Sequence, residues 1–136
     1  VENLSVTFAR GRVVKYTAER GEENVRQLLK TDEGASRLGE VALVPHNSPI
    51  SQCGLIFYNI LIDENASSHI ALGHAYKFGL DKGEALSDEE FAAAGGNLSS
   101  VHLDFMIGSG EMDVDGLRDD RTPDPVMRGG EWAFKV

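Results

Sequence analysis

Apolar and polar residues alternate in two short runs at the start of the chain, residues 3–9 and residues 13–18, with a glycine-containing segment at 10–12 between them. Alternation with a period of two is typical of half-buried strands, and a glycine between two such runs favours a tight turn. The pattern therefore predicts a β-hairpin. After Gly21, apolar residues recur at helical spacing through residues 22–30 behind two glutamates, which predicts a short amphipathic helix.

Two apolar runs of strand length follow, at residues 41–44 and residues 55–62, separated by a polar loop. Continuous apolar runs of this length are consistent with buried strands, and we expect the second run to be buried on both faces. Asp63 or Asn65 is a suitable N-cap residue for a helix that extends through Tyr76. The middle of the sequence therefore predicts two strands followed by a helix.

Residues 87–90 form a capping-box pattern that predicts a second helix, which ends at a pair of glycines at 95–96. Residues 101–107 read as a strand, while the tail from 111 onward mixes turn residues with a last strand at 131–136. These elements predict the α+β class, as a single domain of mixed strands with a few short helices.

Composition narrows the class of protein further. The 136 residues include 22 acidic and 13 basic side chains, a net charge of -9, and one cysteine. This length supports one core without a disulfide framework, and the negative charge disfavours nucleic acid as a partner. Because no run approaches the roughly 20 apolar residues of a membrane span and no signal-peptide pattern opens the chain, we expect no membrane association and a cytoplasmic location.

The sharpest chemical pattern is His102-Leu103-Asp104 in the predicted strand at 101–107. Residues two apart in a strand share a face, so the imidazole of His102 and the carboxylate of Asp104 should point the same way. Both are metal-ligand types, although such a pair also occurs as an ordinary hydrogen-bonded pair. The pattern therefore needs further ligands before it indicates a metal site.

Further candidates lie upstream. In the predicted helix His69 and Tyr76, seven residues apart, fall on one stripe, and Glu64 lies at the helix start. Glu40 opens an otherwise apolar strand, which is an unfavourable place for a charge unless a cation or a donor meets it. Each residue also has an ordinary structural explanation: a hydrogen-bonded core histidine, a packing aromatic, a strand-end glutamate facing water.

Five blocks of the sequence, in order, resemble the thermophilic-type metallo-aminopeptidases, the group of aminopeptidase T, aminopeptidase S and PepS. They are LGEVALVP (38–45), SPI (48–50), FYN (57–59), DENASSHIALG (63–73) and HLDFMIGS (102–109). Several long blocks in the right order are more specific than any single pair of residues. The sequence is therefore identified as similar to this family over nearly its whole length.

The resemblance implies an enzyme that removes amino-terminal residues from peptides with a pair of divalent metal ions. It implies metal-ligand roles at Glu40, Glu64, His69, His102 and Asp104, and an active-site tyrosine at Tyr76. Glu40 and Glu64 are both candidates for the general base. Neutral imidazoles favour zinc or cobalt, with magnesium or manganese as further options. The expected partner is a peptide with a free amino terminus.

The resemblance also implies that residues 1–136 are the metal-bearing, carboxy-terminal catalytic segment of a larger two-domain enzyme. Members of the family are commonly homodimers, so the resemblance implies a homodimer for the full-length enzyme. In the family another metal-binding glutamate and a separate amino-terminal domain lie upstream of the segment that resembles this chain. The alternative hypothesis is a non-catalytic structural or dimerisation module, whose histidines and carboxylates make only structural hydrogen bonds. The enzyme hypothesis requires the five ligand side chains to converge.

Overall fold

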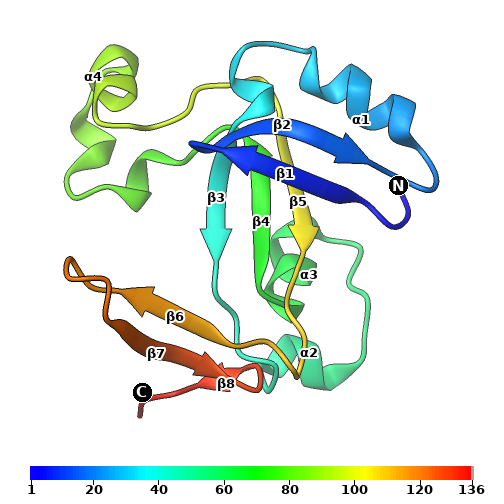
Figure 1. The fold of residues 1–136 in the computed structure, drawn as a ribbon. Helices are drawn as coiled ribbons and strands as arrows, with labels where there is room; N and C mark the ends of the chain where they lie inside the picture. Colours follow the sequence, from blue (N-terminus) through cyan, green and yellow to red (C-terminus); the bar gives the residue numbers. More distant parts are fainter. Residues whose placement is uncertain (136) are drawn as a thin grey trace. The chain divides into compact units, whose positions relative to one another are not determined.

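The computed structural model describes residues 1–135, which form two compact units. The first unit comprises residues 1–40 and 70–104, and the second comprises residues 41–69 and the chain from 105 onward. Strands and short helices are mixed along both units (Figure 1), so the predicted α+β class is confirmed. Among residues 1–135, no helix combines the length and apolar character that a membrane crossing requires.

The first unit opens with the predicted hairpin. Strands β1 (Ser5–Ala9) and β2 (Arg12–Thr17) pair antiparallel, and the two residues between them, Arg10 and Gly11, have φ of 49° and 73°. Positive φ at both central residues is the geometry of a type I′ turn, whose twist matches that of the flanking strands. Gly11 supplies this conformation without steric cost, as the sequence pattern predicts.

Both predicted helices of this unit are also present. Helix α1 (Glu22–Leu29) buries Val25 and carries its glutamates in the first turn. Helix α4 (Asp88–Ala93) has a complete capping box: the Ser87 hydroxyl accepts from the Glu90 N–H, and the Glu90 carboxylate accepts from the Ser87 N–H. Three short 3₁₀ helices complete the unit, η1 (Gly34–Ser36), η3 (Lys77–Gly79) and η4 (Gly83–Ala85).

A three-stranded sheet carries the residues of greatest interest. Its strands are β3 (Leu38–Ala42), β4 (His69–Gly73) and β5 (His102–Met106), with β4 in the centre and running opposite to its neighbours (Figure 1). The prediction of β5 is confirmed. Strand β3 begins and ends earlier than the predicted strand, so Glu40 lies in the middle of a strand rather than at its start.

The predicted helix through Ile70, Gly73 and Tyr76 is wrong, because residues 69–73 form β4. Gly73 has φ of 100°, and a Cβ at this position would lie 1.9 Å from the carbonyl oxygen of Val101. The backbone of β4 therefore approaches β5 more closely than any side chain allows. Its partners are distant in sequence, so local helical spacing gave no sign of them.

The second unit contains short helices and a small sheet. Its helices are α2 (Pro49–Cys53), α3 (Ile60–Asp63) and the 3₁₀ helix η2 (Glu64–Ala66), and its strands β6 (Val114–Leu117), β7 (Pro123–Arg128) and β8 (Glu131–Trp132) pair in that order. The β6–β7 hairpin was not predicted, because its aspartates and prolines are typical of turns. The predicted last strand is limited to β8, and Val136 lies outside the described residues.

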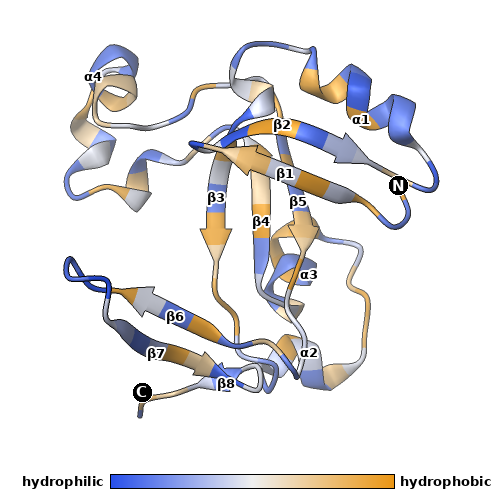
Figure 2. Cartoon of the chain, in the orientation of Figure 1, coloured by the Kyte–Doolittle hydropathy of each residue, from blue (hydrophilic) through white to orange (hydrophobic). Residues whose placement is uncertain are grey.

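The predicted buried strand at residues 55–62 is also wrong. This segment is a loop followed by α3, and Ile56, Tyr58 and Leu61 are 71%, 93% and 69% exposed. Asp63 accepts hydrogen bonds from the N–H groups of Phe57 and Asn59, which hold the loop in a turn. Figure 2 shows apolar positions along this connection between α2 and α3.

Candidate metal centre

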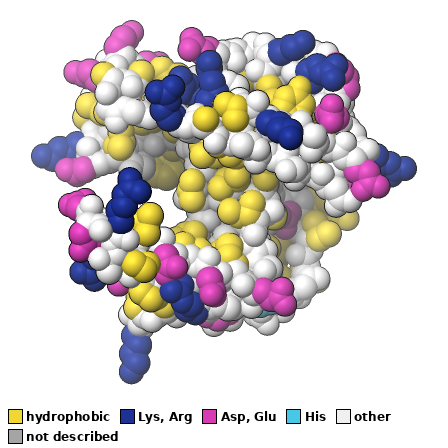
Figure 3. Space-filling view, in the orientation of Figure 1, with side chains coloured by type: hydrophobic (Ala, Val, Ile, Leu, Met, Phe, Trp, Pro, Cys, Tyr) yellow, Lys and Arg dark blue, Asp and Glu magenta, His cyan; other side chains and the backbone are white. Residues whose placement is uncertain are grey.

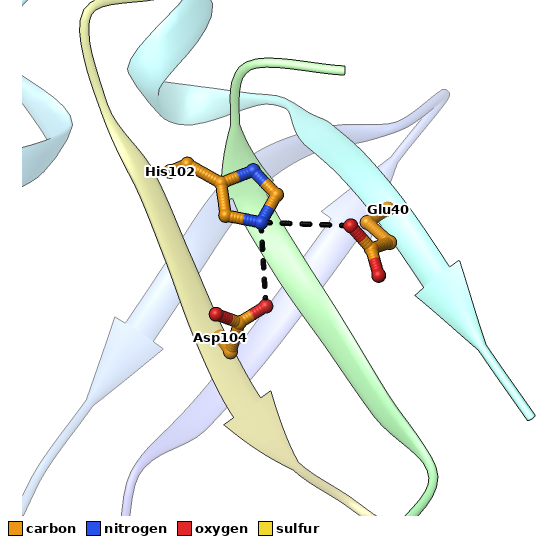
Figure 4. Close-up of side chains that lie close together, drawn as sticks. All are labelled: Glu40, His102 and Asp104. Atoms are coloured by element: carbon orange, nitrogen blue, oxygen red, sulfur yellow. Dashed lines mark ion pairs between the residues drawn. The ribbon is translucent and has the colours of Figure 1, made fainter. Parts of the chain in front are cut away.

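Three predicted ligands meet on one face of the β3–β4–β5 sheet (Figure 4). Glu40 extends from β3, and His102 and Asp104 extend from β5. The Nε2 atom of His102 lies 3.5 Å from a carboxylate oxygen of Glu40 and 3.4 Å from one of Asp104. One ligand atom from each residue lies within 4.8 Å of the others. The arrangement can hold a cation between two carboxylates and an imidazole.

A backbone carbonyl fixes the ring of His102. Its Nδ1 lies 2.8 Å from the carbonyl oxygen of His74, which can only accept a hydrogen bond. In the neutral ring the proton is therefore on Nδ1, and Nε2 presents its lone pair toward Glu40 and Asp104. Metal-binding histidines commonly donate their other ring N–H to a carbonyl or carboxylate in this way.

Asp104 is the more buried of the two carboxylates in this group. Its side chain is only 5% exposed, and neither carboxylate oxygen has a hydrogen-bond partner among residues 1–135. The 3.4 Å separation from His102 is an ion-pair distance rather than a hydrogen bond. Burial of an ionised carboxylate is costly unless a charge or donors compensate it. The residues present therefore fit a divalent metal, and their oxygen and nitrogen donors suit zinc-type coordination.

Glu64 and His69 belong to the second unit. Glu64 begins η2, and His69, 2% exposed, is the first residue of β4. Their ligand atoms lie within 4.8 Å of each other. The Nδ1 atom of His69 lies 2.9 Å from the carbonyl oxygen of Ser67, so a neutral ring carries its proton on Nδ1, as in His102. The rings of His69 and His102 are thus oriented in the same way, by a hydrogen bond from Nδ1 to a backbone carbonyl. The sequence did not indicate these hydrogen bonds.

Tyr76 lies beyond the end of β4 rather than on a helical stripe with His69. Its ring is 41% exposed, with its centroid 4.9 Å from that of His102. The ring also stacks on Phe78, at a centroid distance of 5.3 Å. The structure therefore places the predicted tyrosine beside a predicted metal ligand. Tyr76 reaches this position from the segment after β4 and not from a helix shared with His69. Phe78 was not a sequence candidate, because a single aromatic residue gives no signal of a stacked pair.

Asp32 anchors the segment that leads into β5. Its carboxylate accepts hydrogen bonds from the hydroxyl and N–H of Ser100, the hydroxyl of Ser99 and the N–H of Ala35, at 2.7 to 2.8 Å. The Ser100 hydroxyl, followed by the other donors, holds the pKa of Asp32 well below its ordinary value of 3.8. This carboxylate therefore fixes the backbone two residues before His102.

Replacing Asp32→Asn should lower the melting temperature at neutral pH. A depressed pKa in the folded state means that the carboxylate stabilises the fold above its unfolded value near 3.8, and that this contribution is lost as the pH falls below it. The difference in melting temperature between wild type and variant should therefore shrink on acidification. Thermal unfolding of wild type and variant, at neutral pH and below pH 3.8, measures the difference in melting temperature under each condition. A difference that stays constant over this range would contradict the role of the ionised group.

Asp119→Asn is the matched control. Asp119 is an exposed carboxylate in a loop and makes no side-chain hydrogen bond among residues 1–135. Its replacement should leave the melting temperature within experimental error at both pH values.

Comparison with known proteins decides the family. Residues 1–132 match the family model described as thermophilic metalloprotease (M29). The chain belongs to the thermophilic metalloprotease family. This membership implies the use of a divalent metal ion, in agreement with the carboxylate and imidazole groups of Glu40, His102 and Asp104.

Named members of the thermophilic metalloprotease family are closely similar. The chain is 51% identical over 134 residues to aminopeptidase AmpS of Bacillus subtilis and 56% identical over 133 residues to aminopeptidase T of Thermus thermophilus. Both alignments include 98% of this chain. They include 33% of aminopeptidase AmpS and 32% of aminopeptidase T. The solved structure of wild-type AmpT from Thermus thermophilus matches with a TM-score of 0.85, over 98% of this chain and 32% of that one. The chain thus spans about a third of the length of the relatives it matches.

Proposed function

We propose that the full-length protein is a metallo-aminopeptidase and that residues 1–136 are its metal-bearing, carboxy-terminal catalytic segment. The observation that carries the proposal is Asp104, a buried carboxylate facing the oriented imidazole of His102 and the carboxylate of Glu40. The reaction class comes from the relatives described above, which are aminopeptidases.

Two divalent ions, zinc or cobalt, are the proposed cofactors. The proposed ligands are Glu40, Glu64, His69, His102 and Asp104. The two histidines support a borderline metal, because each presents Nε2 while a backbone carbonyl holds its Nδ1 proton. The carboxylates supply the negative charge that balances the cations.

Each remaining group has a proposed role in peptide hydrolysis. When bound, the ions supply Lewis-acid chemistry, lowering the pKa of water and stabilising negative charge on the carbonyl oxygen of the scissile bond. Glu40 or Glu64 accepts a proton from the attacking water and later delivers it to the leaving amine. The hydroxyl of Tyr76, on a ring beside His102, donates a hydrogen bond to the developing oxyanion.

The proposed substrate is a peptide with a free amino terminus, because the relatives are named aminopeptidases. A carboxylate-rich site is suited to receive a protonated or metal-bound amine. From the family resemblance, we also propose that the full-length protein is a cytoplasmic homodimer.

Metal removal tests the proposal directly. The full-length protein should contain about two zinc or cobalt ions per chain by elemental analysis and should release amino-terminal residues from unblocked peptides. Dialysis against a chelator should abolish this release, and readdition of zinc or cobalt should restore it. Peptides with an acetylated amino terminus are the control substrate and should remain intact. Full activity after verified metal removal would contradict the proposal, and a protein without metal or activity would favour a structural module.

A further inference from the structure

A hollow of about 420 Å³ lies within the first unit, and none of the proposed metal ligands lines it. Its walls come from three places: the hairpin turn with Arg10, the start of β3 with Arg37 and Leu38, and the segment after α4 with Gly96 and Asn97. In Figure 3, Lys and Arg side chains gather near the turn of the β1–β2 hairpin. The hollow is therefore bordered by positive charge.

Backbone hydrogen bonds fix the arginine-bearing walls. The N–H of Leu38 donates to the carbonyl of Gly11 at 2.8 Å, which ties β3 to the hairpin turn. Arg37 is held on both sides, since its N–H donates to Gly34 and its carbonyl accepts from Gly73. The two guanidinium groups therefore extend from backbone positions that are already set.

The opposite wall is equally constrained. The amide of Asn97 donates to the carbonyls of Gly34 and Gly73, at 2.9 and 2.6 Å. Gly96 lies directly against the buried ring of Phe91, where a Cβ would come within 2.4 Å of ring carbons. The hollow is therefore a feature of the folded backbone rather than of a chance side-chain arrangement.

The two arginines at this hollow differ from most others in the chain. Five arginines form ion pairs with carboxylates: Arg12, Arg20, Arg26, Arg118 and Arg128. Among residues 1–135, the side chains of Arg10 and Arg37 have no such partner and donate no hydrogen bond. In a chain with 22 acidic residues and a net charge of -9, two unpaired guanidinium groups at one hollow are unexpected.

We propose that Arg10 and Arg37 form a binding site for an oxyanion, a carboxylate or a phosphate group. A guanidinium group presents a planar set of donors that matches either anion in bidentate geometry. Two such groups at one hollow supply a charge of +2. This charge balances a doubly charged phosphate and exceeds the single negative charge of a carboxylate. The net charge of -9 disfavours anion binding over the protein as a whole, so an anion site depends on locally placed basic groups such as these.

Two sources can supply the anion, and one of them rests on the proposed function. Arg37 precedes Glu40 by three residues in extended chain, roughly 10 Å at about 3.3 Å per residue. Leu38 lines the hollow and lies two residues before Glu40 in β3, so the hollow reaches the strand that carries this proposed ligand. The terminal carboxylate of a short peptide substrate is therefore one source of the anion. Free phosphate is the other source.

Calorimetric titration of the full-length protein with inorganic phosphate tests the site without relying on catalysis. The titration uses chelator-treated protein, so that a metal centre cannot bind the phosphate. We expect saturable binding that weakens at least 10-fold in the double variant Arg10→Gln, Arg37→Gln. Arg37→Lys, which keeps the charge but not the bidentate donors, should weaken binding less. Circular dichroism verifies that each variant is folded.

Arg121→Gln is the matched control. Arg121 is an exposed arginine that also has no side-chain partner among residues 1–135, but it lies outside the hollow. Its replacement should leave phosphate binding unchanged. Equal weakening by Arg121→Gln would show that general surface charge attracts phosphate and would overturn the site.

A second measurement identifies the source of the anion. KM is compared for a tripeptide with a free carboxyl terminus and for the same tripeptide amidated at that end. If the peptide is the source, amidation should raise KM at least 5-fold in the wild type and not in the double variant. Phosphate binding that depends on both arginines, without this KM effect, would identify free phosphate. If neither effect depends on Arg10 and Arg37, the proposal is wrong, whereas phosphate binding in a protein without peptidase activity would support the site and contradict only the proposed function.

Discussion

His102→Ala should reduce kcat/KM for release of amino-terminal residues by the full-length protein by at least about 10³-fold. Loss of a group that only supports a ligand typically costs 10- to 100-fold in metal affinity or activity, and loss of the ligand itself should cost more. His102 is the imidazole that faces both Glu40 and Asp104. The measurement is steady-state kinetics together with metal content by elemental analysis, which should fall in parallel.

His46→Ala provides the control for this experiment. His46 is an exposed loop histidine of the second unit and is not one of the proposed ligands. Its replacement should preserve both activity and metal content. A folded His102→Ala protein that keeps full activity and full metal content would exclude His102 as a ligand and would count decisively against the proposed centre.

Gly73→Ala should lower the free energy of unfolding by about 3 kcal/mol or more, a loss that places it among the largest single-residue effects. The new Cβ would lie 1.9 Å from the carbonyl oxygen of Val101, and φ of 100° is strained for any residue with a side chain. Relief requires β4 to move away from β5, the strand that carries His102. Urea unfolding followed by circular dichroism measures the loss.

Gly54→Ala separates the two causes. Gly54 also has a positive φ, of 63°, but a Cβ there meets no atom within 4 Å among the described residues. This variant should therefore lose only about 1 kcal/mol, the cost of a left-handed backbone conformation. If both alanine variants lose the same free energy of unfolding, close contact between β4 and β5 does not explain the requirement for glycine.

Elements with strong local signals were predicted correctly. The β1–β2 hairpin has alternating residues around a glycine turn, and α4 has a capping box whose two hydrogen bonds lie within four residues. Strand β5 was predicted from its apolar alternation. In the hairpin and in α4 the stabilising contacts are close in sequence. In β5 the alternation of apolar and polar residues indicates which face is buried.

Elements that depend on distant partners were predicted wrongly or missed. Strand β4 was assigned to a helix because its hydrogen-bond partners in β3 and β5 are more than 20 residues away. The apolar run at 55–62 was assigned to a buried strand, although Asp63 holds it in an exposed turn. A run of hydrophobic residues indicates that burial of these side chains is favourable. It does not indicate whether the fold provides a surface against which they can pack.

The candidate site divides in the same way. His102 and Asp104 share a strand, so their common direction followed from a period of two, and the structure places them 3.4 Å apart. The sequence pattern marked Glu40 as a charge in an apolar strand, and the family resemblance implied its ligand role. Its approach to His102 depends on the order of strands in the sheet. The carbonyls of His74 and Ser67 that orient the two histidines belong to the backbone, which leaves no trace in residue types.

On the proposed function, a metal ion bound at the buried carboxylate of Asp104 would make the amount of folded protein depend on the supply of that ion. A ligand that binds only the native state adds about 2.7 kcal/mol of stability at 100 times its dissociation constant. During scarcity of transition metals, newly made chains would therefore unfold more often and be degraded sooner. The cellular level of this protein would then follow nutrient metal even if its synthesis stayed constant.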